Sequence, residues 1–397
     1  MNFNLIYMKS TLFPALAAVL ILANACCENP STRFDDAHFA RLDSIARSYP
    51  VSKNLTFHYV DAKDLTLIGK SNVPTGEYYH RIDTTVFPLG TIGERRQAIS
   101  PAGWALLFKT DSPAIRIKVE YGWEYEAVNT MPLAYHGFDL YVQQDGKWLW
   151  AASKGNYPRY SKHYSDKPVN LIDGMDDSEK VCMLYLPMYS EVKNLEIGVA
   201  EGSRIEAIPS PFRHQVVFHG SSYTQGISIS RAGMAYPLQF SRSTGLGVVA
   251  LGFSGNCKMQ PYFADFLEQV RADAFVFDAF SNPDAKMIKE RLEGFIERMT
   301  ASHPGVPMIF QRTIRREWRN FDKRREASEQ AKQDMSDWLM PELCKKYKDV
   351  YYVVTDATAP DHEASVDGTH PSDYGYTLWA QSIEKPILKI LAQYGIR

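Results

Sequence analysis

The chain has 397 residues, which is long enough for two domains of ordinary size. Hydrophobic residues make up 45% of it and charged residues 23%, a composition typical of folded proteins and not of disordered ones. A formal net charge of -2 and a pI near 6.6 argue against the basic surface that nucleic-acid-binding domains normally carry. We therefore expect a globular protein with a small, neutral or weakly charged partner and no nucleic acid.

The first residues have the pattern of an export signal. Lys9 precedes an apolar stretch from Leu12 to Leu22, and small residues follow up to Cys26. An apolar core of about 7 to 15 residues is typical of such signals and is shorter than the roughly 20 residues of a membrane span. The Ala-Asn-Ala-Cys ending resembles a bacterial lipobox. We expect residues 1–27 to direct export and Cys26 to carry a lipid anchor, which would hold the protein in the periplasm or at the cell surface. The alternative is that the protein is secreted without an anchor.

Short segments with strand patterns fill residues 51–208. In the segment 114–120, Ile115, Ile117 and Val119 alternate with polar or charged side chains, as in a half-buried strand. Comparable segments occur at 138–143, 147–152, 180–187 and 195–200. Several short strands separated by turns favour an antiparallel β-sandwich. The prolines within residues 208–211 then indicate a linker.

From residue 213 onward, strand and helix patterns alternate. Apolar runs predict strands at 215–218, 247–251, 274–277, 307–310 and 350–354. Helical patterns occur at 234–244, 260–271, 285–302, 325–347 and 373–394. Apolar strands between amphipathic helices favour a parallel sheet covered on both faces. Residues 213–397 are therefore expected to form a three-layer α/β domain.

The turn after the first of these strands carries two consecutive serines, Ser221 and Ser222. Active sites collect at the carboxyl ends of parallel strands, where the next helix directs its N-terminal amides. On local grounds either serine could be exposed, and Ser222 is the candidate nucleophile.

Three later turns could complete a site around Ser222. Asp367 and His370 are three residues apart, so the carboxylate can hold the imidazole in the tautomer that accepts a serine proton. Gly255 follows the second strand and Asn282 follows the third. A glycine amide, an asparagine side chain and the nucleophile's own amide would supply three donors to an oxyanion.

This set of turns resembles the four sequence blocks of the SGNH or GDSL-type hydrolase superfamily, and Gly137-Phe138-Asp139-Leu140-Tyr141 resembles the GxDLY signature of a β-domain that precedes some of these enzymes. The resemblance implies a flavodoxin-like sheet. It also implies that Ser222 is the nucleophile, that His370 is the general base and then acid, and that Asp367 orients it. The oxyanion hole would be formed by the amides of Ser222 and Gly255 and by the Asn282 side chain. The reaction would need no metal or organic cofactor.

The chain departs from the family pattern beside the nucleophile. Ser221 stands where the family's aspartate is usual, and Tyr223 stands where leucine or isoleucine is usual. Neither change removes a triad member.

Two other chemistries have weaker support. Asp361, His362, Asp367 and His370 could hold a metal, but their spacing fits neither a helix nor a ribbon site. Cys257 lies next to a glycine-rich turn, but a packed thiol is the simpler interpretation. Cys182 and Cys344 are widely spaced and suggest no disulfide.

Residues 312–319 and 323–325 form a positively charged stretch, which is most simply a solvated loop and helix start. Alternatively, Arg312 and Arg231 could bind an acidic sugar and Trp318 could stack on a sugar ring.

The sequence thus predicts an exported serine esterase that removes small acyl groups, acetyl above all, from carbohydrates. A lipid-directed acylhydrolase, such as a lysophospholipase or thioesterase, is the first alternative. A glycan-binding lipoprotein without activity is the second.

Overall fold

The computed structural model describes residues 36–48, 54–156, 167–355 and 357–397. Residues 1–27, with the predicted lipid anchor Cys26, lie outside this part. The chain divides into two units, residues 1–50 and 51–397. In the first unit, helix α3 (Asp36–Ser48) is described. Within the described ranges, no helix is both long and apolar enough to cross a bilayer.

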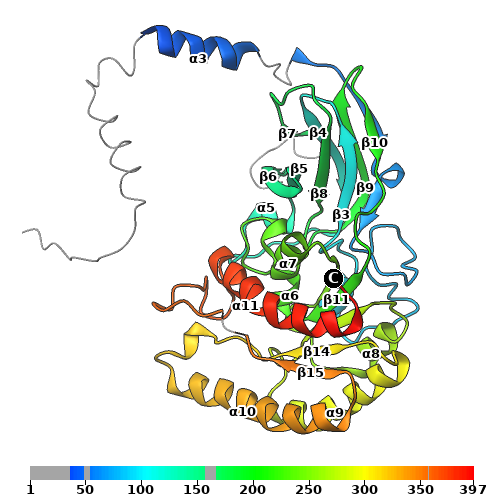
Figure 1. The fold of residues 1–397 in the computed structure, drawn as a ribbon, viewed down its shortest axis with the longest axis vertical. Helices are drawn as coiled ribbons and strands as arrows, with labels where there is room; N and C mark the ends of the chain where they lie inside the picture. The colour runs from blue at the N-terminus through cyan, green and yellow to red at the C-terminus, as the bar shows by residue number, and fades with distance from the viewer. Residues whose placement is uncertain (1–35, 49–53, 157–166, 356) are drawn as a thin grey trace, which may run out of the picture. The chain divides into compact units, whose positions relative to one another are not determined.

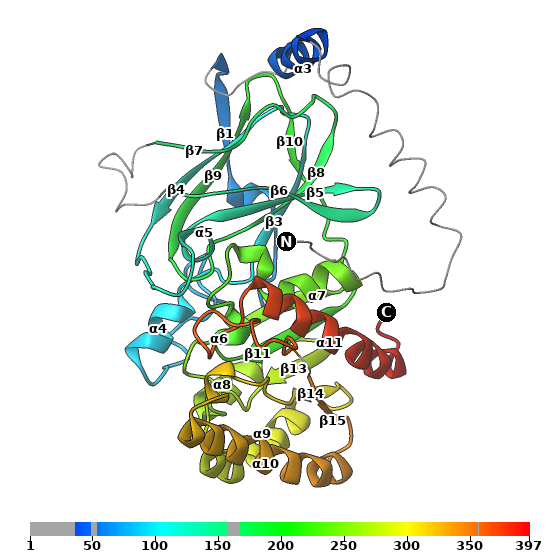
Figure 2. The same ribbon diagram turned by 90° about the vertical axis from the view of Figure 1, so that its left-hand side faces the viewer.

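An antiparallel β-sandwich begins the second unit, as predicted (Figures 1 and 2). One sheet has the order β1-β9-β4-β7, and the other has the order β10-β3-β8-β5-β6 with β2 beside β3. The first sheet comprises β1 (Phe57–Asp61), β4 (Ile115–Tyr121), β7 (Val169–Ile172) and β9 (Val192–Ala200). The second comprises β2 (Thr66–Ile68), β3 (Ala105–Thr110), β5 (Phe138–Gln144), β6 (Lys147–Lys154), β8 (Lys180–Tyr185) and β10 (Ile205–Ala207). Three short helices, η2 (Ala62–Asp64), α4 (Ile92–Ala98) and α5 (Pro132–Tyr135), connect the strands.

Strands β3 and β8 of the second sheet are buried on both faces. Along β3, Leu106 and Phe108 point into the sandwich core, whereas Leu107 belongs to the core of the following α/β domain. Neighbouring β8 does the same with Leu184 and Met183. Successive side chains of a strand point to opposite faces, so one sheet serves two cores. One face of this sheet therefore belongs to the sandwich core and the other to the core of the α/β domain.

Residues from 213 onward form the predicted three-layer α/β domain. All pairs in its sheet are parallel, in the order β12-β11-β13-β14-β15. The strands are β11 (Gln215–Gly220), β12 (Gly247–Gly252), β13 (Ala274–Asp278), β14 (Met308–Gln311) and β15 (Val350–Val353). Numbered from β11, this order is 2-1-3-4-5, which is that of flavodoxin-like folds. The fold prediction is confirmed.

Helices cover both faces of this sheet (Figure 1). Helices α7 (Tyr236–Thr244) and α11 (Asp373–Leu391) pack on one face, and α8 (Pro261–Leu267), α9 (Ala285–Ser302) and α10 (Lys323–Lys346) pack on the other. Along β11, Val216 and Phe218 face the first group and Val217 faces the second. Single turns of helix complete the domain: α6 (Ser222–Gln225), η4 (Ala232–Met234), η5 (Glu317–Arg319) and η6 (Ala392–Tyr394).

The strand register places three turns side by side at the carboxyl end of the sheet. Gly220, the last residue of β11, pairs with Gly252 of β12 and with Asp278 of β13. A Cβ atom on Gly220 would lie 2.7 Å from the Asp278 Cβ, so glycine is required for this close approach. In a 2-1-3-4-5 sheet, ligands bind where the strand order reverses, which here is between β11 and β13.

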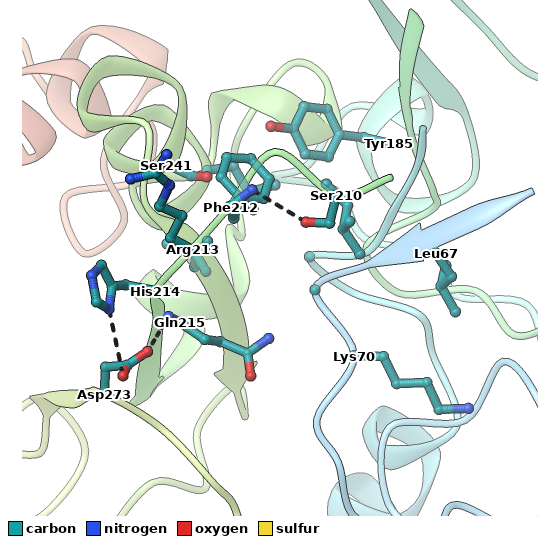
Figure 3. A pocket seen from close by; sticks show the side chains of 16 residues that line it. Leu67, Lys70, Tyr185, Ser210, Phe212, Arg213, His214, Gln215, Ser241 and Asp273 are labelled. Carbon is teal, nitrogen blue, oxygen red and sulfur yellow. Dashed lines mark hydrogen bonds and ion pairs between the residues drawn. The ribbon is translucent and has the colours of Figure 1, made fainter. Parts of the chain in front are cut away.

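A cavity of about 350 Å³ lies at the opposite, amino-terminal ends of β11 and β12 (Figure 3). Asp273 accepts a hydrogen bond from the Gln215 amide at 2.7 Å and lies 3.5 Å from His214. Because Gln215 and Gly247 begin their strands, this cavity is separate from the turn that carries Ser222.

Candidate active site

Three side chains from two turns form a hydrogen-bonded chain. Ser222 is the first residue of α6, directly after β11, and its Oγ lies 3.1 Å from His370 Nε2. The other ring nitrogen, Nδ1, lies 2.8 Å from Asp367 Oδ2. Asp367 and His370 both lie in the turn before α11, so three residues of chain suffice to bring them together. This is the geometry in which an imidazole can take a serine proton.

Gly368 gives this turn its shape. Its φ is +80°, and a Cβ atom there would lie 2.8 Å from the Cβ of Trp318. The Trp318 amide donates a hydrogen bond to the Gly368 carbonyl at 2.8 Å. Only glycine fits both the left-handed backbone and the close approach.

The Asp367 carboxylate is held by four donors. Its Oδ1 accepts hydrogen bonds from the backbone amides of Thr369 and His370, at 2.9 and 2.8 Å. Its Oδ2 accepts from the His370 ring and from Asn129 Nδ2, also at 2.8 Å. Burial acts to raise the pKa of Asp367, but the bonds from His370 and Asn129 outweigh it and lower the pKa to about 2. The group is therefore a carboxylate at neutral pH.

Burial lowers the pKa of His370 below its ordinary value of about 6.5. The hydrogen bond and charge of Asp367 oppose this shift without reversing it. The imidazole is consequently neutral near pH 7, which is the form that can act as a base.

Gly255 and Asn282 lie in the turns on either side of Ser222. Gly255 has φ +74° in the turn after β12, and the Ser254 amide before it donates to Gln225 Oε1 at 3.1 Å and to Gln97 Oε1. Asn282 follows β13, and its Oδ1 accepts a hydrogen bond from the Cys257 amide at 3.1 Å. Its Nδ2 has no hydrogen-bond partner among the described residues. That NH2 group is thus available to a ligand.

Both domains of the chain are similar to known proteins. Residues 213–389 match the GDSL-like lipase/acylhydrolase family, and residues 57–205 match the GxDLY domain described as the N-terminus of SGNH hydrolase-type esterases. A protein of Bacteroides ovatus ATCC 8483, assigned as a GDSL-like lipase, is 36% identical, with a TM-score of 0.79 over 85% of this chain and 98% of that one.

The chain belongs to the GDSL-like lipase/acylhydrolase family.

Two more distant structures share the fold of this GDSL-like acylhydrolase. The salicylyl-acyltransferase SsfX3 from a tetracycline biosynthetic pathway is 19% identical with a TM-score of 0.66, over 86% of this chain and 99% of that one. A family two carbohydrate esterase from Cellvibrio japonicus is 11% identical with a TM-score of 0.55, over 85% and 98%. A search of curated protein sequences found no significant match.

In this GDSL-like acylhydrolase, the Ser221 hydroxyl bonds Asp278, whereas the Ser222 hydroxyl lies against His370. Ser221 is fully buried, and its hydroxyl donates to Asp278 Oδ2 at 2.5 Å while accepting from the Tyr223 amide at 3.2 Å. Asp278 is also buried, and burial raises its pKa against the opposing hydrogen bonds of Ser221 and Ser281. The carboxylate that the family usually has at position 221 is here supplied by β13.

Tyr223, the second departure from the family pattern, links the turn of Ser222 to the turn of His370. Its hydroxyl donates to the Thr369 carbonyl at 2.8 Å and accepts from Arg316 Nε at 2.6 Å. Arg316 is buried, pairs with Glu329 at 2.9 Å and donates to the Ser281 carbonyl at 2.5 Å, next to Asn282. One guanidinium therefore connects three turns of the site.

The three residues suggested for substrate binding already have protein partners. Arg231 pairs with Asp139 of the GxDLY signature at 2.9 Å, and Arg312 pairs with Asp337 at 2.9 Å. The ring of Trp318 lies under the Arg325 guanidinium at 4.1 Å, against the Gly368 turn. The charges of Arg231 and Arg312 are thus matched within the protein.

The structure also separates the residues of the metal hypothesis. His362 pairs with Glu317 at 2.8 Å, whereas His370 pairs with Asp367. Among the residues that the structure describes, no three His, Cys, Asp or Glu side chains gather closely enough to hold a metal. Cys257 is buried, and burial raises the pKa of its thiol well above the ordinary value, so it is protonated and packed.

Proposed function

We propose that this protein is an exported serine esterase that removes small acyl groups, acetyl in particular, from carbohydrates. The observation that carries the proposal is the hydrogen-bonded chain from Ser222 through His370 to Asp367. Family membership supports carboxylic ester hydrolysis as the class of reaction. A glycan-binding protein without activity would have no need to keep this geometry.

In the proposed mechanism each group has one role. His370 Nε2 takes the proton of Ser222 as its Oγ attacks the ester carbonyl, and the oxyanion accepts hydrogen bonds from the amides of Ser222 and Gly255 and from Asn282 Nδ2. The imidazolium then gives its proton to the departing sugar oxygen, which leaves an acyl group on Ser222. Water attacks that ester with His370 as base, and the acid is released.

Two observations support a small acyl group on a sugar. The fold is shared with a family two carbohydrate esterase. The side chains that hold the turn of Gly255 are polar, namely Gln97, Gln225 and Ser254. A long acyl chain needs an extended apolar groove, and polar groups around this turn favour a short acyl group.

Export and lipid attachment remain part of the proposal on the pattern of residues 1–27. Metabolic labelling with a radioactive fatty acid tests it in a bacterial host. The wild-type protein should incorporate label and Cys26→Ser should not, whereas an unlabelled wild-type protein in the medium would indicate free secretion.

Activity is tested with protein lacking residues 1–27. It should hydrolyse an aryl acetate faster than the octanoate and release acetate from acetylated xylan or pectin. Ser222→Ala should lose several orders of magnitude in kcat. Ser228→Ala is a matched control, because this buried hydroxyl near the site has no partner in the described structure. A preference for octanoate would favour the lipid-directed alternative.

A further inference from the structure

A residue of the β-domain completes the hydrogen bonds of the Asp367 carboxylate. Asn129 lies between β4 and α5 and donates from Nδ2 to Asp367 Oδ2 at 2.8 Å, across 238 residues of sequence. The other donors, the Thr369 and His370 amides and the His370 ring, belong to the turn that carries the carboxylate. In the described part of the chain, Asn129 is thus its sole donor from outside that turn.

We propose that Asn129 is a positioning residue that aligns Asp367 with His370, so that the β-domain takes part in catalysis as well as in folding. This inference rests on the proposed function and deepens it. Oδ2 accepts from both Asn129 and the His370 ring, so the amide fixes the rotation of the carboxylate that the ring needs. Without Asn129, this side of Asp367, 32% exposed already, would face water, which fixes no orientation.

The segment that carries Asn129 is held at both ends. At its start, Glu191 Oε2 accepts the Trp123 amide at 2.8 Å, and the Glu191 amide donates to the Trp123 carbonyl at 2.8 Å. After Asn129, the buried Thr130 hydroxyl accepts the Ser228 amide of the α/β domain at 2.9 Å. These contacts hold the amide in place before substrate binds, as alignment of a catalytic group requires.

The uncharged side-chain amide of Asn129 suits its place beside the Asp367 carboxylate. The charged groups that act on the His370 ring are Asp367 and Arg316. Asn129→Asp would add a second carboxylate in contact with Asp367, which would favour the imidazolium and move the acidic limb of the pH–rate profile to higher pH. A residue that only stabilised the fold would lower the amount of active enzyme without moving that limb.

The inference is tested by steady-state kinetics on an aryl acetate across pH. Asn129→Ala should lower kcat about ten-fold with KM nearly unchanged, as expected for loss of a hydrogen bond that orients the base's partner. Asn129→Asp should lower kcat further and shift the acidic limb upward. Unfolding curves for both variants separate loss of folded protein from loss of turnover.

Asn72→Ala is the matched control. Asn72 is also a β-domain asparagine that joins the α/β domain, since it donates to the Gln269 carbonyl at 3.1 Å and accepts the Arg271 amide at 2.6 Å. The Asn72→Ala variant should be less stable than the wild-type protein but should keep the wild-type kcat and the wild-type acidic limb of the pH–rate profile. Wild-type kinetics in both Asn129 variants, or equal kcat losses in Asn72→Ala and Asn129→Ala, would overturn the inference. Activity retained in Ser222→Ala would instead overturn the proposed function.

Discussion

The Ser221 hydroxyl donates a 2.5 Å hydrogen bond to Asp278, a buried carboxylate on the neighbouring strand β13. The Ser221 amide donates to the same oxygen at 3.0 Å. A carboxylate therefore supports the nucleophile turn, although the family's usual aspartate is missing from position 221. The serine and the aspartate act as a pair.

Restoring the family's aspartate alone should harm the protein. Ser221→Asp would put two buried carboxylates in contact, and we expect it to cost about 3 kcal/mol or more of unfolding free energy at pH 7. The exchange Ser221→Asp with Asp278→Ser should recover most of that loss, because one carboxylate and one hydroxyl are again paired. Urea unfolding measures both. Equal stability of the single and double variants would contradict the pairing.

Loss of the Tyr223 hydroxyl should affect turnover more than substrate binding. Tyr223→Phe leaves Arg316 Nε and the Thr369 carbonyl without a partner, so we expect a loss of about 1 to 3 kcal/mol in stability and roughly ten-fold in kcat. Tyr352→Phe is the control, because that hydroxyl donates to Asp337 within α10, away from the triad. An unchanged kcat in Tyr223→Phe would show that the histidine turn needs no such link.

The signature aspartate of the β-domain should matter chiefly for stability. The Asp139 side chain is fully buried and accepts hydrogen bonds from Arg231, the Gly233 amide and Trp150 Nε1. Asp139→Asn leaves the Arg231 charge unpaired, and we expect unfolding to become easier by about 3 kcal/mol. Glu196→Ala, which removes an exposed partner of Lys118, should cost under about 1 kcal/mol. Equal losses would argue against a structural role for the signature.

The pH dependence of kcat/KM follows from the pKa shifts at the triad. Burial lowers the pKa of His370 below the ordinary histidine value of about 6.5, so the imidazole stays neutral at pH values somewhat below 6.5. Activity should therefore fall only when the pH drops through the lowered pKa. Asp367, with a pKa of about 2, stays ionised throughout. An acidic limb centred above about 7 would contradict the assignment.

Acid should also destabilise the fold, which sets the lower limit for that experiment. Burial lowers the pKa of His136 and of His219 to about 4. Below about pH 6.5 the unfolded chain takes up protons that the folded protein does not, so stability falls until pH reaches about 4. Initial rates should therefore be recorded with unfolding curves at the same pH.

The sequence predicted all five strands of the α/β sheet because their side chains are apolar toward both faces. For the same reason β3 was not predicted: Ala105 to Phe108 pack into two cores, so apolar and polar residues do not alternate along this strand. The local Asp367 turn is visible in sequence, since three residues connect it to His370. Asn129 and Arg316 were not predicted, because only the fold brings them to the site. The ion pairs of Arg231 and Arg312 with carboxylates of the protein were not predicted for the same reason.

The most direct test of the central claim is covalent labelling with a fluorophosphonate, which reacts with an activated serine and expels fluoride. Peptide mass spectrometry should find the phosphonyl group on Ser222 of the wild-type protein and none on Ser222→Ala, with esterase activity lost in step with labelling. Label on Ser221, or an unlabelled protein that still hydrolyses esters, would contradict Ser222 as the nucleophile.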